Sequence, residues 1–179
     1  NTLNSLSSLV MTGRAERAEE MIQAMSSFYR HSLAEDTTAD VPLADEFALQ
    51  RDYLEIEEAR FPERLTTRFD LPSDLEDCRV PGMILQPLVE NSVKYAVSPT
   101  KKTITVEVSA RAEGDTLVLR VADNGAGPPE GIAHGFGIGL NNVRDRLEAR
   151  FGERASIVSG VRAEGAGYAT EIILPRDCR

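Results

Sequence analysis

The first third of the chain carries apolar residues at helical spacing. One stripe lies near the start and a second follows Gly13, and both recur at intervals of three and four residues. That spacing is typical of one face of an α-helix. The stripes are Leu3, Leu6, Leu9 and Val10, and then Met21, Ile22, Met25, Phe28, Tyr29 and Leu33. The pattern predicts two amphipathic helices with a break between them.

A third helix is predicted from about residue 43 to residue 61. Residues 35–42 are polar and rich in helix breakers, which indicates a loop before it. Phe47, Leu54 and Phe61 then recur every seven residues. Three such helices have too few large apolar residues to bury their own stripes. We therefore expect partner helices, most simply from a second copy of the chain.

After Pro62 the pattern changes to alternating strands and amphipathic helices. The expected strands are 64–70, 103–110, 116–121, 155–161 and 168–174, and the expected helices are 81–97, with Pro81 in its first turn, and 140–151. A turn at Gly114-Asp115 is expected to join one hairpin. The predicted fold class is α+β, with a helical segment over residues 1–61. Residues 62–179 then form an α/β sandwich, a mixed and largely antiparallel sheet with helices on one face.

The composition narrows the functional classes. The chain has 179 residues, of which 41% are hydrophobic and 27% charged, enough for a real core. Its net charge of −9 opposes direct binding to nucleic acid or anionic lipid. We expect neither a membrane span nor a signal peptide in these residues. Cys78 and Cys178 form no CxxC motif, so they are interpreted as isolated thiols of a cytosolic protein.

The predicted helix 81–97 has an unusual polar face. Glu90, Asn91 and Lys94 lie opposite the apolar arc when residues advance by about 100° each. Asparagine is a weak helix former, so its place between a glutamate and a lysine calls for a reason. The amide oxygen of Asn91 is a suitable ligand for Mg²⁺, which usually shares its oxygen ligands with substrate phosphates. Lys94 offers positive charge to the same phosphates. A solvated surface helix is the simpler alternative.

A glycine-rich stretch follows the predicted strand 116–121. Asp123 stands at the strand end, where a carboxylate can accept a hydrogen bond from an amino group, and small residues after it let a flat ligand approach the backbone. A second glycine group precedes the helix that begins near Leu140, whose exposed N–H groups favour an anion, with Arg144 and Arg146 nearby. The two groups are Gly125 and Gly127, and then Gly135, Gly137 and Gly139. Neither the GxxxxGK[ST] loop nor the GxGxxG turn is present. Taken singly, each glycine has a purely structural alternative, a tight turn.

The order of these motifs resembles the N, G1 and G2 boxes of the Bergerat ATP-binding fold, which histidine kinases, gyrase-type ATPases and mismatch-repair ATPases share. The resemblance is sharper for one family. The segments NTLNSLSSL, YLEIEEARFPERL, LQPLVENSVKYA and GIGLNNVRDRL look like those of LytS/YehU-like sensor histidine kinases. The similarity spans essentially the whole chain. It implies a dimerisation and phosphotransfer segment up to residue 61, then an ATP-binding catalytic domain.

The resemblance also implies roles for single residues. Asn91 would help to ligate Mg²⁺, Glu90 would lie beside the metal, and Lys94 would face the phosphates. Asp123 would hold the adenine amino group, with Gly125 and Gly127 beside it and residues 124–136 as a lid. The phosphates would meet the residues around the second glycine group, which are Gly135, Gly137, Gly139, Leu140 and Arg144. The implied cofactors are ATP and Mg²⁺.

The partners implied by the resemblance are a second copy of the chain and the receiver domain of a response regulator. We expect no direct contact with nucleic acid. The family places such a kinase core on the cytoplasmic side of the bacterial inner membrane, attached through segments upstream of this chain. The sequence is therefore expected to be part of a longer protein.

The sequence departs from the family pattern at several positions. The family's acceptor motif reads His-Phe-Leu-Phe-Asn, and Asn1 resembles its last residue, so the acceptor histidine is expected upstream. His31 is an alternative acceptor, but the family has none there, and a bundle histidine is the simpler interpretation. His134 is interpreted as a loop residue. The late motif reads Gly165-Ala166-Gly167-Tyr168, where the family has GxGT, and Tyr95 stands where relatives often have histidine.

Three other functions stay open. One is an ATPase of the same fold, although its catalytic glutamate would stand at the position of Pro87. Another is an anti-sigma-type serine kinase, whose phosphoserine is stable in acid whereas phosphohistidine is not. The third is a dimerisation module that senses nucleotide without catalysis.

Overall fold

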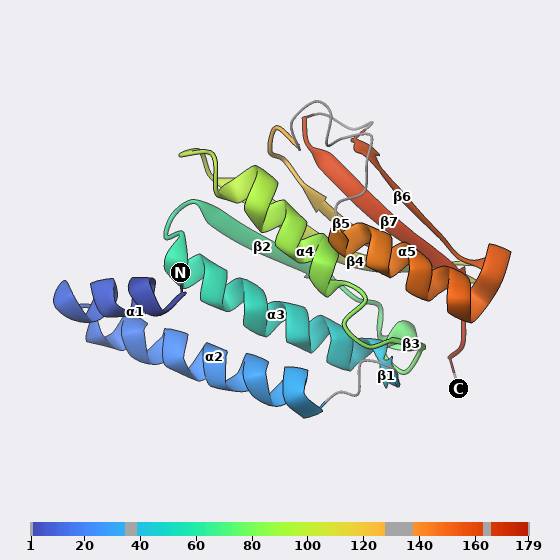
Figure 1. Cartoon of the computed structure of the whole chain (residues 1–179), viewed down its shortest axis with the longest axis horizontal. Coiled ribbons are helices and arrows are strands. Elements are labelled where there is room, and N and C mark those ends of the chain that lie inside the picture. Colours follow the sequence, from blue (N-terminus) through green and yellow to red (C-terminus); the bar gives the residue numbers. More distant parts are fainter. Residues whose placement is uncertain (1, 35–38, 128–137, 163–165, 179) are drawn as a thin grey trace.

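A mixed five-stranded sheet forms one layer of the protein (Figure 1). The computed structural model describes residues 2–34, 39–127, 138–162 and 166–178. The strand order is β2-β4-β5-β7-β6, in which β2 and β4 are parallel and the other neighbours antiparallel. The strands are β2 (Leu65–Asp70), β4 (Ile104–Glu113), β5 (Thr116–Asp123), β6 (Ser156–Val161) and β7 (Tyr168–Pro175). The predicted strands and the largely antiparallel sheet are confirmed.

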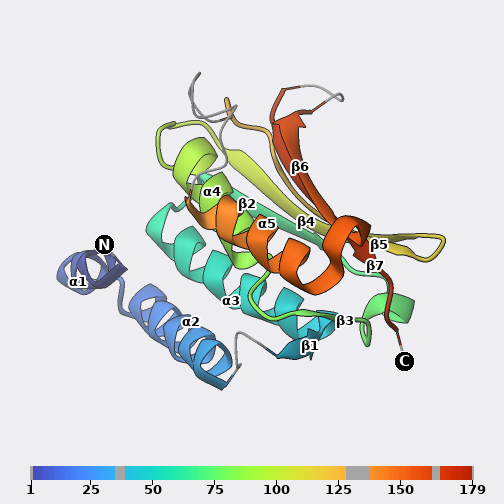
Figure 2. The same ribbon diagram turned by 45° about the vertical axis from the view of Figure 1, so that its right-hand side comes forward.

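Helices cover one face of this sheet, as Figures 1 and 2 show from two directions. They are α3 (Leu43–Arg60), α4 (Gln86–Ser92), which continues as a π-helical turn over Val93–Val97, and α5 (Ile138–Phe151). Outside α3 lie α1 (Thr2–Met11) and α2 (Ala15–Ala34). A small two-stranded sheet joins β1 (Asp40–Pro42) to β3 (Arg79–Pro81), and short 3₁₀ turns span Ser73–Leu75 and Gly152–Arg154. The predicted α+β class is confirmed.

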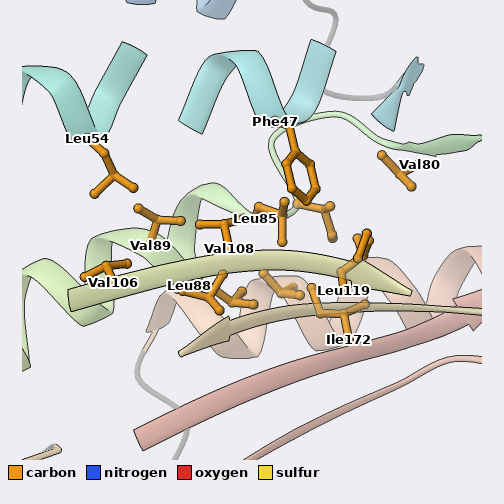
Figure 3. Close-up of a cluster of buried hydrophobic side chains, with 14 of the residues drawn as sticks. Phe47, Leu54, Val80, Leu85, Leu88, Val89, Val106, Val108, Leu119 and Ile172 are labelled. Carbon is orange, nitrogen blue, oxygen red and sulfur yellow. The ribbon is translucent and has the colours of Figure 1, made fainter. Parts of the chain in front are cut away.

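The main core lies between the sheet and the helices (Figure 3). Phe47 and Leu54 of α3 point toward Val89 of α4 and Val108 of β4. Thus α3, which the sequence groups with the helical segment 1–61, shares the core of the sheet. The outer helices are joined to α3 by a separate small cluster, which consists of Leu9, Ala18, Met21, Ala24 and Ile56.

The start of the fourth helix differs from the prediction. Pro81 does not open a helix but ends β3, within the two-stranded sheet. The helix begins at Gln86, and Pro87 occupies its first turn, where a missing N–H costs no helical hydrogen bond. The sequence holds two prolines at either end of one apolar run, and only the pairing of β3 with β1 separates their roles. That pairing also turns the end of the predicted loop 35–42 into a strand.

The interpretation of the cysteines as isolated thiols is wrong. Cys78 and Cys178 form a disulfide across 100 residues of sequence. The chain after β7 runs antiparallel to the segment before β3, so that the two cysteines lie in a β-bridge and the Arg79 N–H donates to the Asp177 carbonyl at 2.7 Å. Sequence spacing carries no sign of this pairing, because it depends on the order of strands in the sheet.

Candidate functional site

The polar face predicted for the helix around Asn91 is present on α4 and on the π-helical turn that continues it. Glu90 and Lys94 are exposed and Asn91 is half-buried, whereas Leu88 and Val89 are buried on the opposite side. The Gln86 amide donates to Glu90 Oε1 at 3.0 Å, one turn along the helix. The amide of Asn91 is therefore presented at the edge of the helix layer.

The end of this helix has a π-helical turn, in which the Ser98 N–H donates to the Val93 carbonyl at 2.9 Å. Such turns are uncommon and often mark functional sites. The guanidinium of Arg64 donates to the carbonyls of Val97 at 2.8 Å, Ser98 at 3.3 Å and Thr100. A cation that binds the final carbonyls stabilises a helix end. The segment that carries Asn91 and Lys94 is thus fixed at its C-terminal end.

Asp123 is a buried carboxylate at the end of β5, with only 3% of its surface exposed. The Gly125 N–H donates to its Oδ1 at 3.0 Å, and the Ser92 hydroxyl and the Tyr168 N–H also donate to this carboxylate. Burial raises the pKa of Asp123 above its ordinary value, while these donors and the charge of Arg162 act in the opposite direction. An ionised carboxylate has about four acceptor positions, so one remains for a ligand beyond these three donors.

Gly125 marks a close approach between the strand end and the helix. A Cβ added at this position would lie 2.5 Å from the Cβ of Ala96 and 2.9 Å from its Cα. Any side chain would therefore push the Asp123 loop away from the helix. The sequence interpretation of Gly125 as a residue that lets a flat ligand approach the backbone stays a prediction, because the neighbour seen here is the protein's own helix.

The start of α5 lies against the start of α4. A Cβ added at Gly139 would be 3.4 Å from the Cβ of Pro87, and the Arg146 guanidinium donates to the Gly82 carbonyl at 2.8 Å. Leu140 is buried in the core, so at that position the backbone, not the side chain, is available to a ligand. The N–H groups of the first turn of α5 therefore lie beside the helix that carries Asn91.

These contacts bring the predicted motifs together around one helical segment, residues 86–97. Residues 86–97 touch Asp123 through Ser92, Gly125 through Ala96, and Gly139 through Pro87. The carboxamide, the strand-end carboxylate and the helix N-terminus thus border one region. Among the described residues, no group of three or more His, Cys, Asp or Glu side chains is placed to hold a metal ion. The donor set suits a cation held by a single amide oxygen and by ligand phosphates.

Other predicted residues are placed differently or not described. Arg144 is exposed and lines a hollow of about 330 Å³ between α5 and β6, together with Leu147 and Ile157. The phosphate contact of Arg144 stays a prediction. Gly135, Gly137 and His134 lie outside the described residues, as does the side chain of His31. Gly127 is described and has a φ of +76°.

Sequence reasoning missed the contribution of α3. Glu46 is fully buried there, and its two carboxylate oxygens accept the N–H groups of Met83 and Leu85, each at 2.7 Å. This holds the loop that leads into α4. In a helix rich in acidic residues, a glutamate is normally predicted to be exposed to solvent. The local sequence feature that indicates burial of Glu46 is its place next to Phe47.

Further along α3, acidic groups face the Asn91 helix. Burial raises the pKa of Glu57, which Arg60 opposes through an ion pair at 3.1 Å and Glu90 reinforces by its charge. Burial also raises the pKa of Tyr53, and Glu57 and Glu90 add to this rise. Glu90 therefore stands in a negative environment, beside the position assigned to a cation.

Comparisons with known proteins give the same picture over both parts of the chain. Residues 1–65 match a family model described as histidine kinase. Residues 77–177 match a model described as histidine kinase-, DNA gyrase B-, and HSP90-like ATPase. No helix in the described part of the chain is long and apolar enough to cross a membrane.

Similar proteins are sensor kinases. The chain is 37% identical to the sensor histidine kinase BtsS of Escherichia coli over 86% of this chain and 27% of that protein. It is 29% identical to the sensor protein LytS of Staphylococcus haemolyticus over 88% of this chain and 29% of that protein. The resemblance to the LytS group is confirmed. The chain spans less than a third of the length of these relatives.

Solved structures show the same fold at low identity. The catalytic domain of the histidine kinase ThkA superposes with a TM-score of 0.60 at 16% identity, covering 77% of this chain and 95% of that domain. ThkA in complex with the response regulator protein TrrA gives a TM-score of 0.56 at 16% identity, over 94% of this chain and 50% of that chain. The fold is therefore that of histidine kinase catalytic domains, the Bergerat fold.

Proposed function

The chain belongs to the family of histidine kinase-, DNA gyrase B- and HSP90-like ATPases, and we propose that it is the kinase core of a two-component sensor histidine kinase. The observation that carries the proposal is the contact of residues 86–97 with both the Asp123 loop and the start of α5. The match of residues 1–65 to a histidine kinase model favours a kinase over another ATPase of the fold.

ATP is the proposed substrate of this site. Asp123 accepts the amino group of the base, with Gly125 and Gly127 beside it, and the first N–H groups of α5 after Gly139 meet the phosphates. Asn91 contributes its amide oxygen to a magnesium ion, and Lys94 adds positive charge. The bound ion supplies charge neutralisation for the phosphates. Gly135, Gly137 and Arg144 complete the proposed phosphate contacts.

The proposed reaction is phosphoryl transfer to histidine. A ring nitrogen of an acceptor histidine attacks the γ-phosphorus with its lone pair, and the bond to the bridging oxygen breaks, so that ADP leaves with that electron pair. The phosphoryl group then passes to an aspartate of a response regulator. The side chains of the site mainly hold the reactants in line and offset their charge. The negative charge of the Glu90 carboxylate is proposed to polarise the reacting groups in the site. A Glu90→Gln variant that keeps the full transfer rate would contradict that role.

A transfer assay tests the proposed function. We expect the 179-residue chain to bind ATP, to leave itself unlabelled by γ-labelled ATP, and to label a supplied helix that carries the family's acceptor histidine. The label should be lost in acid and kept in base, as phosphohistidine is. Acid-stable label would indicate a serine kinase, and phosphate release without an acceptor would indicate an ATPase. ATP binding without any phosphoryl transfer would indicate a dimerisation module that senses nucleotide without catalysis.

The Asn91→Asp substitution tests the magnesium role. The substitution replaces the neutral amide oxygen with a charged carboxylate, which changes the charge and geometry of the proposed ligand of the ion that the phosphates share. We expect the affinity for ATP with Mg²⁺ to fall by about tenfold or more, and the affinity for ATP in a chelator to change much less. Titration calorimetry with and without Mg²⁺ measures both. Equal losses in the two conditions would argue against Asn91 as a magnesium ligand.

We propose that residues 1–61 form the dimerisation and phosphotransfer segment, whose last helix α3 shares its core with the ATP-binding domain over 62–179. The outer helices support this, because α1 and α2 keep several large apolar side chains exposed, namely Leu3, Val10, Met11, Ile22 and Tyr29. A second copy of the chain is the proposed cover. The response regulator is the second proposed partner, and a complex of ThkA with TrrA is the precedent within the fold.

The proposed location is the cytoplasmic side of the bacterial inner membrane, with attachment through other parts of the parent protein.

A further inference from the structure

Tyr168 stands beside the Asp123 carboxylate on the helix-covered face of the sheet. The two residues are direct partners in the β5–β7 register, and directly opposed residues point to the same face. Residues two and four positions along the same strands share this face, and three of them, Val121, Leu119 and Ile172, belong to the core. The Tyr168 ring is therefore directed toward the region that Asp123 borders, and its own N–H donates to that carboxylate.

The row continues to the edge of the sheet. Val161 of β6 pairs with Tyr168, and β5, β7 and β6 lie side by side (Figure 2). Tyr168 is only partly buried and Val161 is 80% exposed. A buried acceptor, an aromatic ring and an uncovered apolar side chain thus follow one another in a line across three strands.

The loop after Asp123 lies close to the ring. Gly127 has a φ of +76°, and a Cβ added there would lie 3.2 Å from Cδ2 of Tyr168 and 3.5 Å from its Cβ. The loop backbone can approach the ring this closely only because residue 127 has no side chain. The ring therefore lies between the Asp123 loop and the edge of the sheet.

We propose that Tyr168 is a further binding residue of this site and contacts the purine base through its aromatic face. The proposal rests on the proposed ATP-binding function and names a second contact to the base beside Asp123. A purine presents an amino group at its edge and an apolar face, which match the free acceptor position of Asp123 and the ring beside it.

Three variants separate the ring from its polarity and its bulk. Tyr168→Phe keeps the ring, Tyr168→Leu keeps apolar bulk without it, and Val158→Ala removes an exposed apolar side chain from β6. We expect the phenylalanine variant and the β6 variant to bind ATP with Mg²⁺ as the unmodified chain does. The leucine variant should bind about tenfold more weakly, which is the scale of base stacking on an aromatic side chain. Titration calorimetry gives the affinities, and melting temperatures of the unliganded variants report on folding.

Inorganic triphosphate with Mg²⁺ is the second probe, since it has no base. The leucine variant should bind inorganic triphosphate as tightly as the unmodified chain does. A stacked ring shifts the H2 and H8 protons of bound ATP upfield in the NMR spectrum, and this shift should be lost when ATP binds to the leucine variant. Equal losses for ATP and inorganic triphosphate, or no loss for either with unchanged NMR shifts, would overturn the proposal for Tyr168. Failure of the unmodified chain to bind ATP would instead overturn the proposed function, and this proposal with it.

Discussion

Replacing Asp123 with asparagine is expected to remove most ATP binding while the unliganded chain stays folded. The carboxylate has one acceptor position beyond its three donors, Gly125, Ser92 and Tyr168. An asparagine amide turned toward the ligand would present hydrogens to the amino group of the base, and turned the other way it would face its own backbone donors. Hydrogen bonds to charged groups contribute about 1.5–3 kcal/mol, so the affinity should fall by about 10- to 100-fold.

Calorimetric titration with ATP and Mg²⁺ measures this loss. Asp115→Asn is a matched control, because Asp115 is an exposed aspartate in the turn at the far end of β5. The control should bind ATP as the unmodified chain does. Unchanged affinity in the Asp123 variant would place the base elsewhere and would remove the central contact of the proposed site.

The Asp123→Asn substitution also tests how the buried carboxylate affects the stability of the unliganded chain. Burial raises the pKa of Asp123, so the folded chain holds the proton more tightly than the unfolded chain. The ionised carboxylate therefore costs stability above its folded pKa, and this cost disappears as the pH falls through the folded pKa toward the unfolded one. At neutral pH the asparagine variant is free of this cost, which offsets part of the stability that it loses because its amide nitrogen cannot accept the donors of the carboxylate. On acidification toward the unfolded pKa, the unmodified chain should gain stability relative to the variant.

Urea unfolding at a series of pH values measures that difference, and ATP affinity over the same series should fall with the pH as the acceptor is protonated. A binding site that costs stability is common where function requires a buried charge. A variant that is much less stable at neutral pH would show that Asp123 is held mainly for the fold.

Replacing Glu46 with alanine is expected to cause the largest loss of stability. Glu46 is fully buried and accepts two N–H groups in the loop before α4, from Met83 and Leu85. Without the carboxylate the buried Leu85 N–H and the part-buried Met83 N–H have no acceptor from residue 46, and each unsatisfied donor costs about 1–3 kcal/mol. The free energy of unfolding should fall by about 2–6 kcal/mol. Met83 has a φ of +57°, so this loop also loses the support for a disfavoured conformation.

Glu46→Gln is the informative second variant. Its amide oxygen can accept one of the two N–H groups while its amide nitrogen opposes the other, so the loss should be smaller than that of the alanine variant. Glu55→Ala removes an exposed carboxylate from the same helix and should change the stability by less than about 0.5 kcal/mol. Urea unfolding of the three variants compares them. If Glu46→Ala unfolds like Glu55→Ala, the carboxylate does not hold the loop.

The local pattern of the sequence was sufficient for most elements and for part of the site. Alternation predicted β4 and β5, and the three-to-four spacing predicted α5, because side chains repeat with the period of the element that carries them. The polar face of Glu90, Asn91 and Lys94 followed from the same geometry. Asp123 and Gly125 followed from their place at the end of a strand.

The local sequence pattern did not reveal which residues from distant segments contact each other. Pro81 and Pro87 look equivalent along the chain, and the pairing of β3 with β1 decides which one enters a helix. Only the tertiary structure placed Ser92 at Asp123 and the Tyr168 ring against Gly127. The same holds for Cys78 beside Cys178 and for Glu46 inside the core. These contacts depend on strand order and on the packing of helices over the sheet. Those are properties of the whole folded chain, whereas periodicity records only which face of its own element a residue occupies.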